Sequence, residues 1–221
     1  MKYAIIADIH ANWEGLQTVL ADAQANKVTH YACLGDVVGY NANPKECLDL
    51  VRSMGMPVVK GNHDEYCSVD AALEGFNPHA AEAVNWTRAQ LTEEDILWLR
   101  EMRYIRLVAN FTIVHATLDG PKRWGYVFDK LAAAASFTYQ NTGVCFFGHT
   151  HVPVAFVRDA TVRGGTSTMT SPCHVMTSRP PVVTSPMSVA VTSHLRQMAR
   201  KASTLAGATI AHMRSCDSLM R

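Results

Sequence analysis

The sequence of 221 residues lacks several features that would place it in common classes of protein. Its six cysteines form no C-x-x-C pair and no short regular framework, which argues against a structural zinc site and a disulfide scaffold. No hydrophobic run is long enough to span a bilayer, and Asp8 comes too early for a signal-peptide core, so we expect a cytoplasmic protein without a membrane partner. A formal net charge of +1 gives no electrostatic reason to expect nucleic-acid binding.

Aromatic residues are absent from the C-terminal part of the chain, since no Phe, Trp or Tyr follows Phe156. Residues 160–221 contain 7 Lys/Arg against 1 Asp/Glu, whereas residues 1–159 contain 13 against 18, so the two parts carry net charges of opposite sign. Ser, Thr and Met are frequent in the same C-terminal part. We therefore expect one domain over residues 1–158, followed by an atypical Ser/Thr/Met-rich basic tail over residues 159–221.

The first part has the pattern of an α/β protein that is long enough to bury a full core. Apolar runs of strand length alternate there with stretches of helical period. The expected strands are Tyr3–Ile9, Thr29–Leu34, Met56–Lys60, Arg103–Val108, Phe111–Val114, Val144–Phe147 and Val154–Val157. The expected helices are one that Asn12 caps, then Pro44–Met54, Pro78–Leu91, Glu93–Met102, Asp129–Thr138 and, in the tail, Ser193–Ser203.

Asp36 is the carboxylate around which the other polar motifs are arranged. It follows an apolar run that ends at Leu34, and it stands between Gly35 and Gly39. An ionised Asp at the mouth of a buried strand must be paired or metal-bound, since its desolvation is otherwise expensive. Taken alone, this position allows an ion pair or a single metal. We expect Asp36 to bridge two metal ions, provided that the other motifs supply ligands at the same place.

Four further motifs follow expected strands. They are Asp8-Ile9-His10, Gly61-Asn62-His63-Asp64, His115 and Gly148-His149-Thr150-His151. Because side chains alternate along a strand, residues two apart, such as Asp8 and His10, would lie on the same face. Each motif alone also has an ordinary explanation: a capping Asp beside a surface His, a turn, a core histidine, or a polar turn before a proline.

The motifs are more informative together than singly, because five separate ordinary explanations would all have to hold. Together they offer oxygen and imidazole ligands for two mixed sites, without thiolate, and such a set suits Mn²⁺, Fe or Zn²⁺. The amide oxygen of Asn62 would be a neutral ligand. The adjacent His63 is a titratable group that could protonate a departing oxygen.

This ordered series of motifs resembles that of the calcineurin-like metallophosphoesterase superfamily. The forms Gly-Asp-Val-Val-Gly-Tyr at residues 35–40 and Gly-His-Thr-His at residues 148–151 are similar to those of its small bacterial and archaeal phosphodiesterase-type members. The resemblance covers about residues 1–158. It implies a four-layer α-β-β-α sandwich with the metals at the strand ends, and measured against that pattern the C-terminal part is expected to be atypical and incomplete.

The resemblance also implies a role for each motif residue. One ion would be held by Asp8, His10, Asp36 and His151. The second ion would be held by Asp36, Asn62, His115 and His149, with Asp36 shared. His63 would be the proton donor, and Asp64 would orient it.

On this resemblance we expect a dinuclear metal-dependent phosphoester hydrolase, a phosphodiesterase or phosphatase, that acts on a small phosphoester or a nucleotide. Two cations roughly 3.5–4 Å apart would hold a bridging hydroxide as the nucleophile and neutralise the phosphoryl oxygens during in-line attack. The cofactors would be two divalent ions, with Mn²⁺ favoured and Fe, Zn²⁺, Ni²⁺ or Mg²⁺ as alternatives. The alternative function is a non-catalytic metal-binding scaffold with the same fold, inactive because of its altered C-terminus.

Two departures from the family pattern affect the interpretation. Val38-Gly39-Tyr40 stands where members that act on phosphoproteins have an arginine, so a protein phosphatase is disfavoured. The Asn-x-Gly-Ser element that usually follows the last histidine motif is absent from residues 160–221. The tail is therefore either a disordered basic extension or not the natural continuation of the domain, for example after a change of reading frame.

Substrate choice is expected to depend on loops that the motifs do not determine. These are Asn41–Asn43, Tyr66–Pro78 and Thr117–Tyr126. In the third loop, Trp124 could stack a base, and Lys122 with Arg123 could bind a phosphate. The alternative is that these loop side chains have no role in binding.

Overall fold

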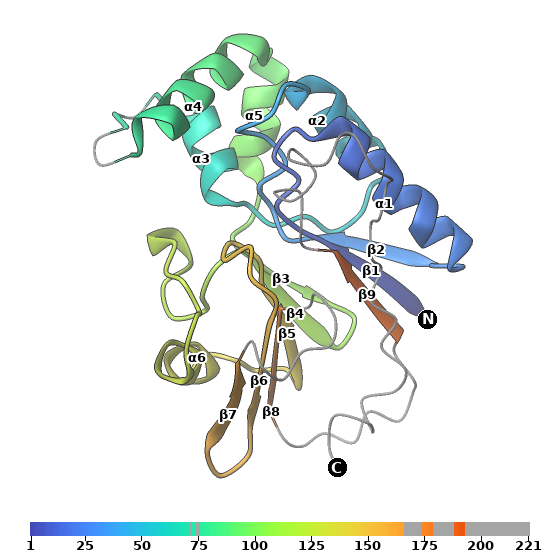
Figure 1. The fold of residues 1–221 in the computed structure, drawn as a ribbon, viewed down its shortest axis with the longest axis vertical. Helices are drawn as coiled ribbons and strands as arrows, with labels where there is room; N and C mark the ends of the chain where they lie inside the picture. The colour runs from blue at the N-terminus through green and yellow to red at the C-terminus, as the bar shows by residue number, and fades with distance from the viewer. Residues whose placement is uncertain (71, 74–75, 166–173, 179–187, 193–221) are drawn as a thin grey trace, which may run out of the picture.

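The computed structural model describes residues 1–70, 72–73, 76–165, 174–178 and 188–192 (Figure 1). These residues form a mixed α/β fold in which two sheets are flanked by helices. The four-layer sandwich expected from the sequence is confirmed. In the part of the chain that is described, no helix has both the length and the apolar character needed to cross a membrane.

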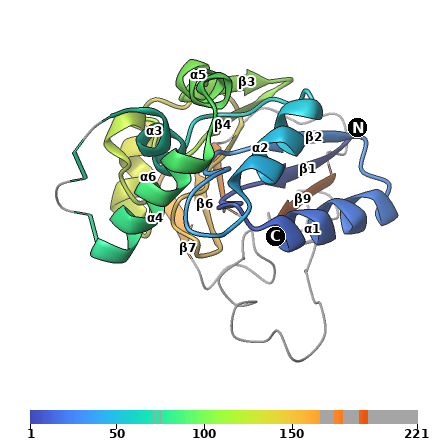
Figure 2. The same ribbon diagram turned by 90° about the horizontal axis from the view of Figure 1, so that it is seen from above.

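The first sheet has three parallel strands in the order β2-β1-β9. Its strands are β1 (Lys2–Ile6), β2 (His30–Cys33) and β9 (Ser188–Thr192). The helices that follow β1 and β2 are α1 (Trp13–Ala25) and α2 (Pro44–Ser53), and both views place them together beside these strands (Figure 1, Figure 2). Three more helices continue this layer: α3 (Asn62–Ser68), α4 (Pro78–Gln90) and α5 (Glu93–Glu101).

The second sheet has six strands in the order β3-β4-β5-β8-β6-β7. The antiparallel pair β3 (Ile105–Val108) and β4 (Phe111–Val114) forms the expected hairpin. A connection through the short 3₁₀ helix η1 (Pro121–Arg123) and α6 (Lys130–Phe137) leads to β5 (Val144–Phe146), which is parallel to β4. The remaining strands are β6 (Val154–Arg158), β7 (Val162–Gly165) and β8 (His174–Ser178).

Three hydrophobic clusters hold the four layers together, because successive side chains of a strand face opposite sides of its sheet. On β1, Tyr3 and Ile5 face the other sheet, whereas Ile6 packs with residues of α1 and α2. On β5, Phe146 joins the cluster between the sheets, and Cys145 joins the cluster beneath α6. Each sheet therefore buries both faces.

The helix starts follow the sequence signals. Asn12 caps α1 by accepting a hydrogen bond from the Gly15 amide at 2.8 Å, and Pro44 opens α2. Thr92 and Asp95 form the expected capping box of α5. The segment Met56–Lys60 differs from the expectation: instead of a strand it makes two isolated bridges, Cys33 to Val58 and Val59 to Arg103.

Strand pairing continues beyond residue 158, where we expected an atypical tail. The strands β7, β8 and β9 all follow that residue, and β8 lies between β5 and β6 in the second sheet. These residues therefore contribute strands to both sheets. The expected helix at Ser193–Ser203 lies outside the described residues, and the domain boundary at residue 158 stays a prediction.

The carboxylate of Asp95 links α5 to α2 and is fully buried. Its Oδ2 accepts from the amide and hydroxyl of Thr92 at 3.0 and 2.7 Å, and its Oδ1 pairs with Arg52 at 2.7 Å. We predict that Asp95→Ala lowers the free energy of unfolding by about 2–4 kcal/mol, because both the helix cap and the buried partner of Arg52 are lost. Urea denaturation measures this change.

The matched control is Glu94→Ala, since Glu94 also pairs with Arg52 but its side chain is 84% exposed. An exposed pair of this kind contributes less than about 1 kcal/mol. Equal losses of stability in the two variants would contradict the role given to Asp95.

Candidate metal centre

The five sequence motifs meet at the C-terminal ends of strands from both sheets. Asp8 and Asp36 follow β1 and β2, and Asn62 begins α3. His115 follows β4, and the Gly148–His151 motif follows β5. This is the edge at which open α/β sheets place their ligand sites.

Left-handed backbone conformations, rather than strand alternation, bring the paired motif residues together. β1 ends at Ile6, before Asp8 and His10, so the expectation that these two share one face of a strand is wrong. Positive φ angles occur at Asp8 (54°), His10 (50°), Asp36 (53°), His149 (70°) and His151 (52°). Such conformations are unfavourable for residues other than glycine, and they concentrate at functional sites.

The first group of donor atoms comes from Asp8, His10 and His151. The Nε2 atom of His151 lies 3.3 Å from Oδ1 of Asp8 and 3.1 Å from Nε2 of His10. The backbone amide of His149 donates to the Asp8 carboxylate at 3.0 Å, which fixes that side chain across the two sheets. All three donor atoms lie within 4.8 Å of one another, a spacing that one cation could bridge.

The second group comes from Asp36, Asn62, His115 and His149. Nε2 of His115 lies 3.3 Å from Oδ2 of Asp36, 3.1 Å from Oδ1 of Asn62 and 3.2 Å from Nδ1 of His149. His115 is therefore at the middle of this group and is fully buried.

Asp36 belongs to both groups through the same oxygen. Its Oδ2 atom lies 3.3 Å from Nε2 of His115 and 3.6 Å from Nε2 of His10. Its Oδ1 atom accepts from the backbone amide of His63 at 2.8 Å, so the carboxylate cannot turn freely. The side chain is 1% exposed, and an anion in that position needs cationic partners.

Backbone carbonyls bind the second nitrogen of three imidazoles. Leu34 O lies 2.8 Å from Nδ1 of His115, and Val38 O lies 3.3 Å from Nδ1 of His10. On His149 the pattern is reversed, because Trp124 O lies 2.9 Å from Nε2. When each of these nitrogens donates, the other nitrogen of the ring is left with a lone pair that faces the group of donor atoms, as metal-ligating histidines require.

The pKa shifts leave three of the expected ligands deprotonated and the fourth, His115, protonated. Burial alone would raise the pKa of Asp8, but the hydrogen bond from His151 and the charges of His115 and His151 together lower that pKa to about 2. Burial lowers the pKa of His10 to about 3 and that of His149 to about 4. Burial alone would lower the pKa of His115, but the charge and hydrogen bond of Asp36, with the charge of Asp8, together raise it to about 9, so His115 holds a proton that a bound cation would displace.

This donor set fits divalent metal ions. It combines two carboxylates, one amide oxygen and four imidazoles with restrained orientations, and it includes no thiolate. Mixed nitrogen and oxygen ligation of this kind suits Mn²⁺, Fe or Zn²⁺. The structure brings together the seven side chains expected as ligands from the sequence.

His63 lies beside the two groups. Its ring centroid is 4.7 Å from that of His10 and 4.3 Å from that of Tyr40, and its Nδ1 is buried without a hydrogen-bond partner among the described residues. Burial lowers the pKa of this imidazole. Its donor atoms also lie within 4.8 Å of those of His10 and Asp36, so position alone allows it to be either a ligand or a proton donor.

The contacts of Asp64 differ from the role expected for it. We expected this carboxylate to orient the His63 ring, but it accepts four backbone amides instead. Oδ2 accepts from Asp36 at 2.8 Å and from Gly61 at 3.0 Å, and Oδ1 accepts from Val37 at 2.9 Å and from Val38 at 3.3 Å. Asp64 is thus a positioning residue for the loop that carries Asp36. Burial raises its pKa to about 7.

Gly61 allows the two central motifs to approach closely. A Cβ atom at this position would lie 2.1 Å from Oδ1 of Asp36 and 2.4 Å from the amide nitrogen of Asp36. No side chain fits there, which explains the glycine before Asn62.

The loop that precedes α6 contributes aromatic rings that the sequence identified only in part. The ring of Trp124 packs 5.9 Å from His115 and 5.8 Å from Tyr104, so it is part of the wall of the site, and its role in stacking a base stays a prediction. Tyr126, which was not singled out from the sequence, lies stacked on His149 with ring centroids 4.1 Å apart. The only feature of the sequence that pointed to Tyr126 was its position at the end of a loop expected to affect substrate specificity.

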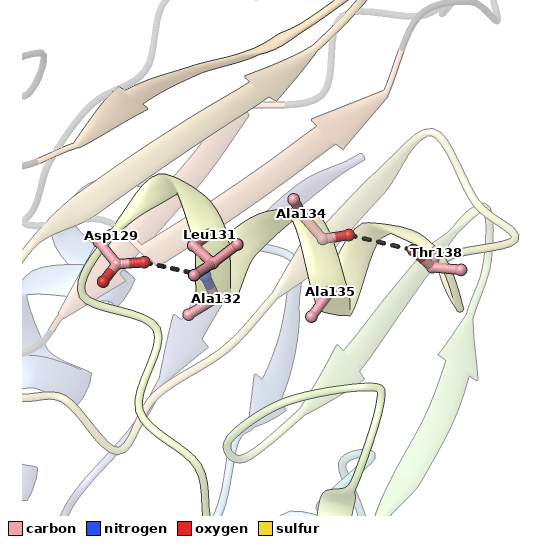
Figure 3. Close-up of a pocket in the computed structure, with 6 residues that line it drawn as sticks. All are labelled: Asp129, Leu131, Ala132, Ala134, Ala135 and Thr138. Carbon is pink, nitrogen blue, oxygen red and sulfur yellow. Dashed lines mark hydrogen bonds between the residues drawn. The ribbon is translucent and has the colours of Figure 1, made fainter.

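A hollow on the surface of α6 is separate from these groups (Figure 3). It is lined by Asp129, Leu131, Ala132, Ala134, Ala135 and Thr138. Its two polar side chains bond within the helix, Asp129 to the Ala132 amide at 2.9 Å and Thr138 to the Ala134 carbonyl at 3.1 Å. This lining offers one carboxylate and no imidazole, so the metal chemistry belongs to the buried groups.

Comparison with known proteins agrees with this geometry. The sequence model of the calcineurin-like phosphoesterase superfamily domain matches residues 1–184. An uncharacterised protein of Methanocaldococcus jannaschii is 34% identical over 154 residues, which span 68% of this chain and 62% of that protein, less than two thirds of its length.

Two solved structures share the fold. The crystal structure of a metallophosphoesterase from Sphaerobacter thermophilus is 32% identical with a TM-score of 0.64, over 80% of this chain and 74% of that one. A hypothetical protein from Pyrococcus horikoshii is 16% identical with a TM-score of 0.63, over 100% and 91% of the two chains. The second likeness bears on the fold alone. The chain belongs to the calcineurin-like phosphoesterase superfamily.

Proposed function

We propose that this protein is a dinuclear metal-dependent phosphoester hydrolase that acts on a small phosphoester. The observation that carries the proposal is the position of Asp36, whose Oδ2 faces an imidazole of each group, His10 at 3.6 Å and His115 at 3.3 Å. One carboxylate oxygen between two nearly complete ligand sets is the arrangement that a pair of bridged cations requires. Family membership supports the reaction class.

Two divalent cations bound by these residues would supply charge neutralisation of the phosphoryl oxygens and a water that is nucleophilic at neutral pH. The protein supplies the rest of the site. Asp64 fixes the backbone from Asp36 to Val38, and the carbonyls of Leu34, Val38 and Trp124 orient three imidazoles. Burial of the ligands excludes bulk water and strengthens each electrostatic interaction.

His63 is proposed to protonate the leaving oxygen. Its ring lies beside His10 and Tyr40 at the border of the site, and its unpartnered Nδ1 leaves one nitrogen free of structural hydrogen bonds among the described residues. A positioned imidazole can transfer a proton to a departing alkoxide. Tyr40, 42% exposed, would limit how the imidazole can tilt.

Mn²⁺ is our preferred metal, with Fe, Zn²⁺, Ni²⁺ or Mg²⁺ as alternatives, because imidazole and carboxylate donors are mixed in both groups. We also propose a cytoplasmic location. Four cysteines, at positions 33, 47, 67 and 145, are free and buried, which suits a reducing compartment. The scaffold alternative shares the metal centre but would lack turnover.

One prediction of this proposal concerns metal stoichiometry. After reconstitution with Mn²⁺ and removal of excess metal, the wild type should hold about two equivalents. His151→Ala should hold about one, because His151 serves a single group and its side chain is 23% exposed, so its loss is tolerated by the fold. Asp36→Asn should hold less than one, because the shared ligand is weakened. Elemental analysis of the purified proteins measures all three.

The control for this series is His79→Ala, an exposed histidine on α4 that should leave two equivalents bound. Circular dichroism checks that each variant is folded. A folded wild type with a single equivalent, or a His151→Ala variant with two, would refute the dinuclear assignment.

Another prediction of this proposal concerns His63. We expect His63→Ala to lower kcat by about 10²–10⁴-fold for an ester with an alkyl leaving group, because protonation of that oxygen is lost. An ester with a nitrophenyl leaving group should be affected less, because its oxygen departs without a proton. Both rates are measured at saturating Mn²⁺, and bound metal is measured in parallel.

Each outcome of this experiment separates one role from another. Equal losses for the two esters would show that His63 is not the proton donor, and loss of bound metal would make it a ligand. A metal-loaded wild type without turnover of either ester would favour the scaffold.

A further inference from the structure

The segment before α6 carries two large aromatic side chains that the core does not use. Tyr126 is 54% exposed and Phe128 is 52% exposed, whereas Val127 between them is fully buried in the cluster beneath α6. Val127 therefore anchors the segment and leaves both rings at the surface. Adjacent exposed apolar side chains, unlike single ones, commonly mark a binding site.

The two rings continue a stack that begins at the metal centre. Tyr126 lies on His149 with ring centroids 4.1 Å apart and an interplanar angle of 18°. Phe128 lies on Tyr126 with centroids 5.2 Å apart and an angle of 8°. His149 is one of the expected metal ligands, so the stack leads from a ligand to solvent.

The base of the stack is held in place by contacts on both sides. His149 Nε2 bonds to the carbonyl of Trp124 at 2.9 Å, and its Nδ1 lies 3.2 Å from Nε2 of His115. The same loop presents cations, since Lys122 lies over the ring of Tyr104 at 5.0 Å and Arg123 pairs with Asp119 in an exposed position. A loop that carries both aromatic rings and cations suits a ligand that is planar at one end and anionic at the other.

We infer that Tyr126 and Phe128 form a stacking subsite for the planar aromatic group of the phosphoester, a nucleobase or an aryl ring. This inference rests on the proposed function, because the phosphoryl group must lie at the metal centre for its substituent to reach the stack. The subsite determines specificity and takes no part in bond breaking. Stacking tolerates different rings, so the subsite would favour esters with a planar group over aliphatic esters without distinguishing one nucleobase from another.

The test compares matched ligands that the protein cannot hydrolyse, using the full chain loaded with Mn²⁺. Phenylphosphonate against methylphosphonate measures what an aryl ring adds to binding, and nucleoside 5′-phosphonates against ribose 5-phosphonate measure what a base adds. Calorimetry gives a dissociation constant for each. In the wild type the planar group should tighten binding at least about fivefold in one pair, and the pair that responds identifies the ring preferred.

In the pair that responds, the dissociation constant of the aliphatic ligand divided by that of the planar ligand should fall close to one in Phe128→Ala and Tyr126→Ala. Tyr126→Phe should preserve the wild-type ratio, because the ring remains. Tyr139→Ala is the matched control, since that ring is 58% exposed and lies after α6. Metal content shows whether His149 still ligates in each variant.

The outcomes distinguish failure of this inference from failure of the proposed function. If methylphosphonate does not bind the metal-loaded wild type, the phosphoryl site itself is refuted. If methylphosphonate binds but neither planar group adds affinity, the subsite alone is refuted. If Phe128→Ala weakens the planar and aliphatic ligands equally, the rings act by supporting His149, which also overturns the subsite.

Discussion

The burial of one carboxylate, that of Asp36, is the constraint on which the rest of the site depends. One of its oxygens accepts from the His63 amide, and the other faces the imidazoles of His10 and His115, which follow β1 and β4. Removing such an anion from water requires opposite charge nearby, so histidines must converge on it from both sheets. Asp64, buried beside it, uses its own carboxylate to hold the backbone of the same loop.

The two-sheet architecture makes this convergence geometrically feasible. Each group of donor atoms draws on both sheets: Asp8 and His10 follow β1 and meet His151, which follows β5, whereas Asp36 follows β2 and meets His115, which follows β4. A direct bond crosses between the sheets, from the amide of His149 to Asp8 at 3.0 Å. In the loops that follow these strands, several residues have positive φ angles. The packed layers beneath the loops hold these strained conformations in place.

Much of the fold was predictable because the signals are local. Asn12, Pro44 and the pair Thr92 with Asp95 mark helix starts through hydrogen bonds within one turn. The short strands β7, β8 and β9 were missed, because four or five residues without aromatic anchors give little pattern by themselves. β8 and β9 become strands by pairing with segments farther away in the chain, as β9 does with β1, whereas β7 pairs with the adjacent β6. The opposite error occurred at Met56–Lys60, where the apolar pattern predicted a strand but the segment makes only isolated bridges.

The sequence by itself predicted which residues could be ligands, because the chemistry of carboxylates, imidazoles and amides is a property of residue type, and their order along the chain resembles one superfamily. The tertiary structure alone decided how they meet. It showed that Asp8 and His10 converge through positive φ angles, that Asp64 holds backbone amides, and that Tyr126 stacks on His149. The reason is physical: these contacts join residues that are distant in sequence, and their geometry depends on how the two sheets pack.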